Sequence, residues 1–182
     1  ELLKAHYKKA QQGESKTILI TGEAGIGKSR LLREFKIFVQ LKRGHCFLGS
    51  AHEDKTNPLE SFYDIFRELV NYISNPKMVR TSLAVLFKLF PDLIDSRLGK
   101  NLPELVRLEP NQEKLRNFEA LSELERHVAS SFGELVILLE DLHWVDKSSI
   151  QFLEYLGRNL EDSKVLICGT ARQGVLEANP LL

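Results

Sequence analysis

Apolar residues gather along this chain into short continuous runs that are separated by longer segments of mixed polarity. The purest run covers residues 135–139, and similar runs cover 17–21, 45–48 and 165–169. A run of this length that is bounded by turn residues predicts a strand buried on both faces of a parallel sheet.

Between these runs, apolar residues recur every three or four positions, which predicts amphipathic helices. We expect helices over 4–12, 29–41, 62–73 and 113–131, and a further helix that is capped by Asp146. Strands that alternate with helices predict right-handed crossovers and an α/β fold, a doubly wound parallel sheet with helices on both faces. Residues 76–111 are interrupted by prolines and Gly99, and we expect them to form a helical insertion packed on one face of the sheet.

Size and composition indicate one globular domain that spans 1–182. The chain has 182 residues, of which 43% are hydrophobic, and its apolar runs are far shorter than the roughly 20 residues of a membrane span. It has neither an initial Met nor a leader, which predicts a fragment of a longer cytoplasmic protein. The net charge of zero argues against direct binding of nucleic acid by this domain. Cys46 and Cys168 lie in apolar runs, which indicates buried, reduced thiols.

Residues 22–29 match the phosphate-loop pattern G-x-x-x-x-G-K-[ST] at every fixed position. An apolar strand precedes the pattern and an amphipathic helix follows it, which is the context that the pattern requires. Glycines allow successive backbone N–H groups to point at phosphate oxygens, the lysine reaches the outer phosphates, and the serine hydroxyl binds Mg²⁺. The predicted nucleotide-binding set is Gly22, Glu23, Ala24, Gly25, Ile26, Gly27, Lys28, Ser29 and Arg30.

Two acidic residues, Glu140 and Asp141, follow the run 135–139. They would lie at the carboxyl end of a buried strand, where ligands of open α/β sheets bind. Mg²⁺ beside a phosphate loop needs a carboxylate on its other side, and a second carboxylate can orient or deprotonate the attacking water. We therefore expect one of the pair to hold the metal and the other to act as the base.

The segment 138–146, which reads LLEDLHWVD, resembles the acidic motif of AAA-type ATPase domains of the STAND class. The segments GEAGIGKSRLL, FEAL and GTAR, at 22–32, 118–121 and 169–172, are similar to other parts of the same family. The resemblance covers nearly the whole chain and is loosest in the predicted insertion. It implies a three-layer P-loop NTPase fold whose last strand and helical lid are not in this segment, so that the strand over 17–21 lies at a sheet edge.

The resemblance also implies roles for individual residues. Ser29 and Glu140 fall on the metal-binding positions, and Asp141 falls on the catalytic acid. Arg172 falls on the arginine that approaches the γ-phosphate, although a surface residue that follows a strand is the alternative. His143 either relays a contact from the γ-phosphate or packs the loop, and Trp144 is expected to anchor that loop. Glu140 stands where the family has Asp, so we expect metal binding to persist and hydrolysis to be slow.

The function predicted from these features is ATP–Mg²⁺ binding with slow ATP hydrolysis, as the regulatory switch of a larger signalling or transcription-regulating protein. Its predicted partners are ATP and ADP, other domains of the same chain and a nucleotide-dependent homo-oligomer, with no membrane. A nucleotide-binding module without turnover is the first alternative. A small-molecule kinase is the second, with thin support from Arg158 and Arg172.

Overall fold

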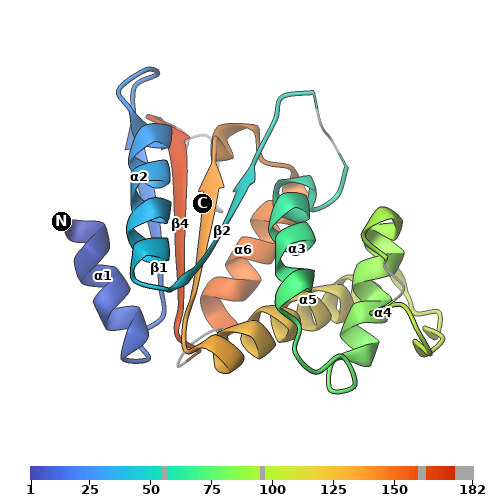
Figure 1. Ribbon diagram of the computed structural model, residues 1–182. Helices are drawn as coiled ribbons and strands as arrows, with labels where there is room; N and C mark the ends of the chain where they lie inside the picture. The colour runs from blue at the N-terminus through green and yellow to red at the C-terminus, as the bar shows by residue number, and fades with distance from the viewer. Residues whose placement is uncertain (55–56, 95–96, 160–162, 175–182) are drawn as a thin grey trace.

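A four-stranded parallel sheet forms the centre of the molecule (Figure 1). The structure is a computed structural model and describes residues 1–54, 57–94, 97–159 and 163–174. The strand order is β1-β4-β3-β2. The strands are β1 (Lys16–Gly22), β2 (His45–Ser50), β3 (Leu135–Glu140) and β4 (Val165–Arg172). The α-helices are α1 (Leu2–Gln11), α2 (Lys28–Leu41), α3 (Tyr63–Leu69), α4 (Arg80–Leu89), α5 (Pro110–Phe132) and α6 (Lys147–Asn159).

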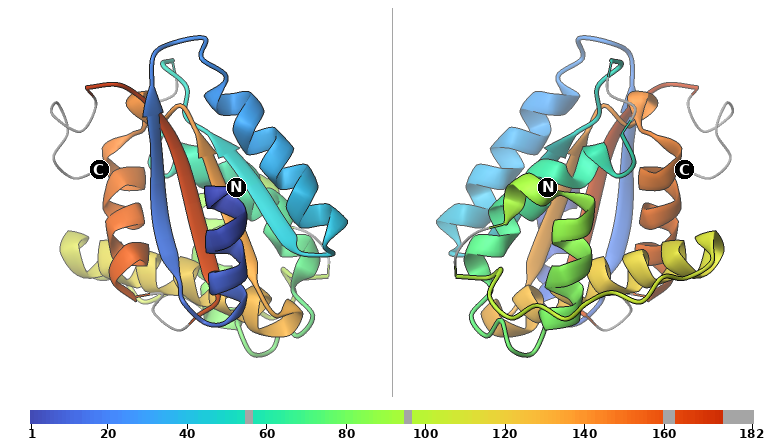
Figure 2. Two further views of the ribbon diagram at one scale, coloured as in Figure 1. Left: turned by 90° about the vertical axis from the view of Figure 1, so that its left-hand side faces the viewer. Right: turned by 90° about the vertical axis from the view of Figure 1, so that its right-hand side faces the viewer.

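Helices cover both faces of the sheet, which confirms the predicted α/β class (Figure 2). Alternate residues of each strand point to opposite faces, so one apolar run supplies two cores. Val136 and Leu138 pack with α1 and α2, whereas Leu135, Ile137 and Leu139 pack with the cluster that includes α3, α5 and α6. All six residues of β3 are buried, because this strand has neighbours on both sides and helices above and below.

Both cysteines lie in the core beside α1 and α2 as free thiols, as the sequence indicated. Burial raises the pKa of the Cys168 thiol to about 12, because the thiolate would lose its hydration there. Burial also raises the pKa of the Cys46 thiol. Neither sulfur is a nucleophile in this fold.

The strands extend further than their apolar runs. Pairing between neighbours continues through residues that no periodicity marks, so that Gly22 lies opposite Arg172 and Ser50 lies opposite Glu140. Hydrogen bonding to an adjacent strand, rather than side-chain polarity, therefore sets where each strand ends.

The region between β2 and β3 differs most from the expectation. The continuous helix predicted over 62–73 is wrong, since the 3₁₀ turns η1 (Glu60–Phe62) and η2 (Val70–Tyr72) flank the shorter α3. Only α4 and the 3₁₀ turn η3 (Pro91–Leu93) are helical among the described residues of 76–109. α4 packs against α5 rather than on the sheet, and six of its ten residues are buried. α5 begins at Pro110 rather than 113, because proline is well suited to the first helical position.

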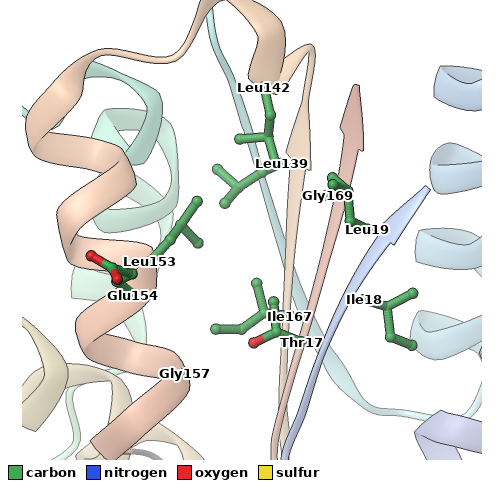
Figure 3. Close-up of a pocket in the computed structure, with 10 residues that line it drawn as sticks. All are labelled: Thr17, Ile18, Leu19, Leu139, Leu142, Leu153, Glu154, Gly157, Ile167 and Gly169. Atoms are coloured by element: carbon green, nitrogen blue, oxygen red, sulfur yellow. The ribbon is translucent and has the colours of Figure 1, made fainter. Parts of the chain in front are cut away.

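β1 stands at one end of the sheet and, among the described residues, pairs with β4 alone. A cavity of about 200 Å³ lies between this edge and α6, lined by Leu19, Leu142, Leu153 and seven further residues (Figure 3). A second cavity of about 670 Å³ lies on the opposite face, beside α1 and α2. Within the part of the chain that the structure describes, no helix combines the length and apolar character needed to cross a membrane.

Candidate nucleotide-binding site

The carboxyl ends of the four parallel strands lie at one edge of the sheet (Figure 1). β1 ends in the phosphate loop, β3 ends at Glu140, and β4 ends at Arg172. Backbone hydrogen bonds join these ends, from Gln173 N to the oxygen of Gly22 (3.3 Å) and from Ala51 N to the oxygen of Glu140 (2.9 Å). Segments that are far apart in the sequence therefore form one continuous surface.

The phosphate loop turns tightly from β1 into α2. Gly25 and Gly27 have φ angles of +80° and +100°, in the left-handed region that favours glycine. Gly27 is the N-cap of α2, whose first backbone hydrogen bond runs from Leu31 N to the oxygen of Gly27 (2.9 Å). The N–H groups that precede Leu31 come before the first intrahelical hydrogen bond, so they can meet an anion, and the helix dipole favours negative charge there.

Lys28 turns its side chain back onto the loop. Its Nζ donates hydrogen bonds to the backbone oxygens of Gly22 (2.9 Å) and Glu23 (2.8 Å). An ammonium has three N–H donors, so a third remains for a phosphate oxygen. Unlike Lys28, Arg30 does not turn its side chain onto the loop. Its guanidinium is paired with Glu34 (2.8 Å), and its side chain is 84% exposed. The structure thus leaves the Arg30 side chain directed to solvent.

The carboxyl group of Glu140 is buried at the end of β3, with only 7% of its side chain exposed. Oε2 accepts a hydrogen bond from Nη2 of Arg33 (3.4 Å), a residue of α2. Oε1 is buried and has no partner among the described residues. A buried carboxylate oxygen without a partner among the described residues suits a hard divalent cation such as Mg²⁺. Ser29, whose hydroxyl is the other predicted metal ligand, is the second residue of the adjacent helix α2.

Asp141 adopts a left-handed backbone conformation, with φ of +59°. Its N–H donates to Oγ1 of the fully buried Thr170 on β4 (3.2 Å), and its side chain is 46% exposed. Aspartate is one of the residues that adopt this region most readily, and the conformation turns the chain sharply at the end of β3. The carboxylate is therefore held at the rim of the site, open to solvent water.

A family model described as an AAA ATPase domain matches residues 1–168, which is most of the chain. This chain belongs to the AAA ATPase domain family. Membership supports nucleotide binding, usually with Mg²⁺, and it agrees with the phosphate loop and buried Glu140 that the geometry brings together.

Two further comparisons describe proteins to which this AAA ATPase domain is similar. The uncharacterized protein R02095 of Rhizobium meliloti (strain 1021) is 29% identical over 184 residues, which covers 88% of this chain and 16% of that protein. The Walker-type ATPase PABY2304 of Pyrococcus abyssi aligns with a TM-score of 0.46 and 16% identity, over 96% of this chain and 45% of that one. The chain thus spans less than half the length of either protein.

His143 and Trp144 form the 3₁₀ turn η4 (Leu142–Trp144) of this AAA ATPase domain. The His143 side chain is 9% exposed, and neither ring nitrogen has a hydrogen-bond partner among the described residues. Burial and then the positive charge of Arg172 lower the pKa of His143, so the imidazole is neutral at neutral pH. Its Nδ1 lies 3.8 Å from Oδ1 of Asp141.

Arg172 lies with its guanidinium carbon 5.7 Å from the centre of the Trp144 ring, at cation–π distance. Trp144 thus contacts the arginine that is expected to approach the γ-phosphate, a contact that the sequence did not suggest. The two residues are 28 positions apart, and only the adjacency of β3 and β4 brings them together.

Asp146 caps α6 as predicted, because its Oδ1 accepts a hydrogen bond from Ser149 N (3.0 Å). The same oxygen accepts a second hydrogen bond from Leu59 N (3.2 Å), in the segment that follows β2. Sequence reasoning missed this link, and it also missed the contacts of Arg33 and Thr170. The only signal for Arg33 was its spacing of four residues from Ser29, which places both on one face of α2.

Proposed function

We propose that this AAA ATPase domain binds ATP with Mg²⁺ and hydrolyses it slowly, as the regulatory switch of a larger signalling protein. The observation that carries the proposal is the buried Oε1 of Glu140, which has no hydrogen-bond partner in the described part of the chain and lies at the same sheet edge as the phosphate loop. If the loop served only to connect a strand to a helix, nothing in that role would explain a nearby buried carboxylate oxygen that lacks a hydrogen-bond partner.

The residues of the loop would divide the phosphate contacts. Backbone N–H groups of residues 22–30 would face the phosphate oxygens, and Lys28 would supply its third N–H donor to the outer phosphate. Ser29 and Glu140 would hold Mg²⁺, which neutralises charge on the β- and γ-phosphates when it is bound. Arg172 would donate to the γ-phosphate and so distinguish ATP from ADP.

Asp141 would act as the base. Its carboxylate would accept the proton of a water molecule that attacks the γ-phosphorus, while the bond to the β–γ bridging oxygen breaks and ADP leaves. Aspartate is one methylene shorter than the glutamate that many ATPases use as base, so its oxygen would reach the water less closely. Slow turnover follows, which suits a switch that must persist in its ATP state.

Support for the switch role comes from the STAND-like acidic segment at 138–146 and from the small share of R02095 that this chain spans. Other domains of the same longer chain would then receive the nucleotide signal, and a nucleotide-dependent homo-oligomer would be the active state. A module that binds nucleotide without turnover is the second candidate, favoured by Glu140 in place of aspartate.

Calorimetric titration of ATP–Mg²⁺ into the wild type and Lys28→Ala tests binding. Loss of a charge-assisted hydrogen bond costs about 2–3 kcal/mol, so we expect affinity to fall by roughly 30- to 150-fold. Equal affinity in the two proteins would contradict the proposal. Steady-state phosphate release from wild type and Asp141→Asn then separates the two candidates, because an ATPase should lose turnover in the variant and keep binding.

A further inference from the structure

Helix α2 carries two chemically different groups on one face, one turn apart. Ser29 lies in its first turn and Arg33 four residues later, so the two side chains are neighbours on the helix surface. Arg33 contacts Glu140, 107 positions away in the sequence, through Nη2 and Oε2 at 3.4 Å. Helix α2 thus carries the proposed metal-binding hydroxyl of Ser29 and also the guanidinium of Arg33, which contacts the proposed metal-binding carboxylate of Glu140.

The two oxygens of Glu140 have different surroundings. Oε2 is paired with Arg33, whereas Oε1 is buried without a partner among the described residues. A carboxylate can accept from an arginine on one oxygen and bind a cation through the other. Arg33 therefore pairs with Oε2 and leaves Oε1 available to bind the metal.

We propose that Arg33 is a positioning residue for the divalent cation. Its guanidinium holds Glu140 by Oε2, so that Oε1 remains available to the metal. The proposal rests on the proposed function of the site. It adds a residue of α2 to the metal-binding arrangement that neither the phosphate-loop pattern nor the acidic segment includes.

A glutamate needs such a partner more than an aspartate does. Its side chain has one more rotatable bond, so an untethered Glu140 would spread its oxygens over more positions, and ordering them on metal binding would cost entropy. Partners that orient a ligating carboxylate typically contribute 10- to 100-fold to metal affinity.

The positive charge of Arg33 acts in the opposite direction, since it repels a cation. The side chain of Arg33 is 66% exposed, so water and salt screen its repulsion of a cation strongly, whereas its direct contact with Oε2 is made at a carboxylate that is only 7% exposed. Orientation should therefore outweigh repulsion, and removal of Arg33 should weaken metal binding rather than strengthen it.

The test measures Mn²⁺ binding by electron paramagnetic resonance, in the presence of a saturating non-hydrolysable ATP analogue. The proteins are wild type, Arg33→Met, Arg33→Lys and the control Arg158→Met. Arg158 forms an Arg–Glu pair with Glu154 on α6 (3.0 Å), so the control removes the same charge away from the metal-binding residues. We expect about tenfold weaker Mn²⁺ binding in Arg33→Met, partial recovery in Arg33→Lys and no change in the control.

Binding of the analogue in EDTA separates this proposal from the proposed function. Arg33→Met should bind the metal-free analogue as the wild type does, because Arg33 acts through Glu140 and the metal. Unchanged or tighter Mn²⁺ binding in Arg33→Met would overturn the positioning role while leaving nucleotide binding intact. A wild type that binds no analogue would overturn both proposals.

A Glu140→Asp background gives a second measurement that does not depend on the stability of one variant. The shorter side chain withdraws its oxygens from Arg33, so Arg33→Met should cost much less Mn²⁺ affinity there than in the wild type. An equal cost in the two backgrounds would show that Arg33 acts independently of Glu140 and would overturn the proposal.

Discussion

Oγ1 of Thr170 accepts a hydrogen bond from the backbone N–H of Asp141, at 3.2 Å. The contact fixes the residue that follows β3 to the adjacent strand β4, and Asp141 is in the left-handed conformation that few aspartates adopt. Thr170 is fully buried, so its hydroxyl has no contact with bulk water. The backbone of the proposed base is thus oriented by a neighbouring strand.

Replacement of Thr170 by valine keeps the shape and removes the acceptor. The Asp141 N–H would then lose its partner, and we expect a loss of about 1–3 kcal/mol in the free energy of unfolding, measured in urea. Turnover should fall while nucleotide affinity is retained, because the loop residues are not changed. Thr170→Ser keeps the hydroxyl and serves as the control for turnover, and a valine variant as stable and as active as the wild type would contradict the role of this hydrogen bond.

Glu125 on α5 is fully buried, and neither carboxyl oxygen has a hydrogen-bond partner among the described residues. Burial raises its pKa from the ordinary 4.5 to about 8, against a smaller lowering effect of the Arg126 charge. The folded protein therefore holds a proton that the unfolded chain releases above pH 4.5, so stability decreases as pH rises from 4.5 to about 8 and is then level.

Glu125→Gln removes this titration. We expect the variant to be more stable than the wild type at pH 8.5, by up to a few kcal/mol, and the difference to shrink towards about pH 5. Urea unfolding of both proteins at several pH values measures this. A stability difference that does not change with pH would show that Glu125 is not protonated in the folded state.

Gly49 of β2 lies where no larger residue fits. A Cβ at this position would stand 2.2 Å from the backbone oxygen of Ser61 and 3.0 Å from Cδ1 of Ile65. Because the backbone of η1 cannot yield as a side-chain end can, we expect Gly49→Ala to lower the free energy of unfolding by about 1–3 kcal/mol.

Gly157 is the matched control for this substitution. It lies within α6, and a Cβ there would meet only Oγ1 of Thr17, at 3.8 Å. Alanine favours helix over glycine, so Gly157→Ala should raise stability by about 0.5–1 kcal/mol. Thermal unfolding of both variants checks the pair, and a stable Gly49→Ala protein would mean that β2 and η1 are less closely packed than described.

Local patterns in the sequence were sufficient for much of the fold. The apolar runs at 17–21, 135–139 and 165–169 all lie within strands. Burial on both faces is confirmed for 135–139 and 165–169 but is wrong for 17–21, where no residue is buried, because β1 stands at the edge of the sheet. Periodicity failed over 62–73, where 3₁₀ turns replace both ends of the predicted helix and only Tyr63–Leu69 is α-helical, while η1 packs against β2 and α6. It also failed to place the ends of strands, which depend on the neighbouring strand.

The sequence by itself determined the phosphate loop, since its eight residues are consecutive and their backbone conformation is governed by local glycines and the start of a helix. It also determined that two consecutive carboxylates stand at the end of a buried strand. Only the tertiary structure decided that Arg33 contacts Glu140, that Thr170 holds Asp141, and that Arg172 lies over Trp144. These contacts join elements that are distant in the chain, and their geometry depends on the strand order and on how α2 lies on the sheet, which no local pattern specifies.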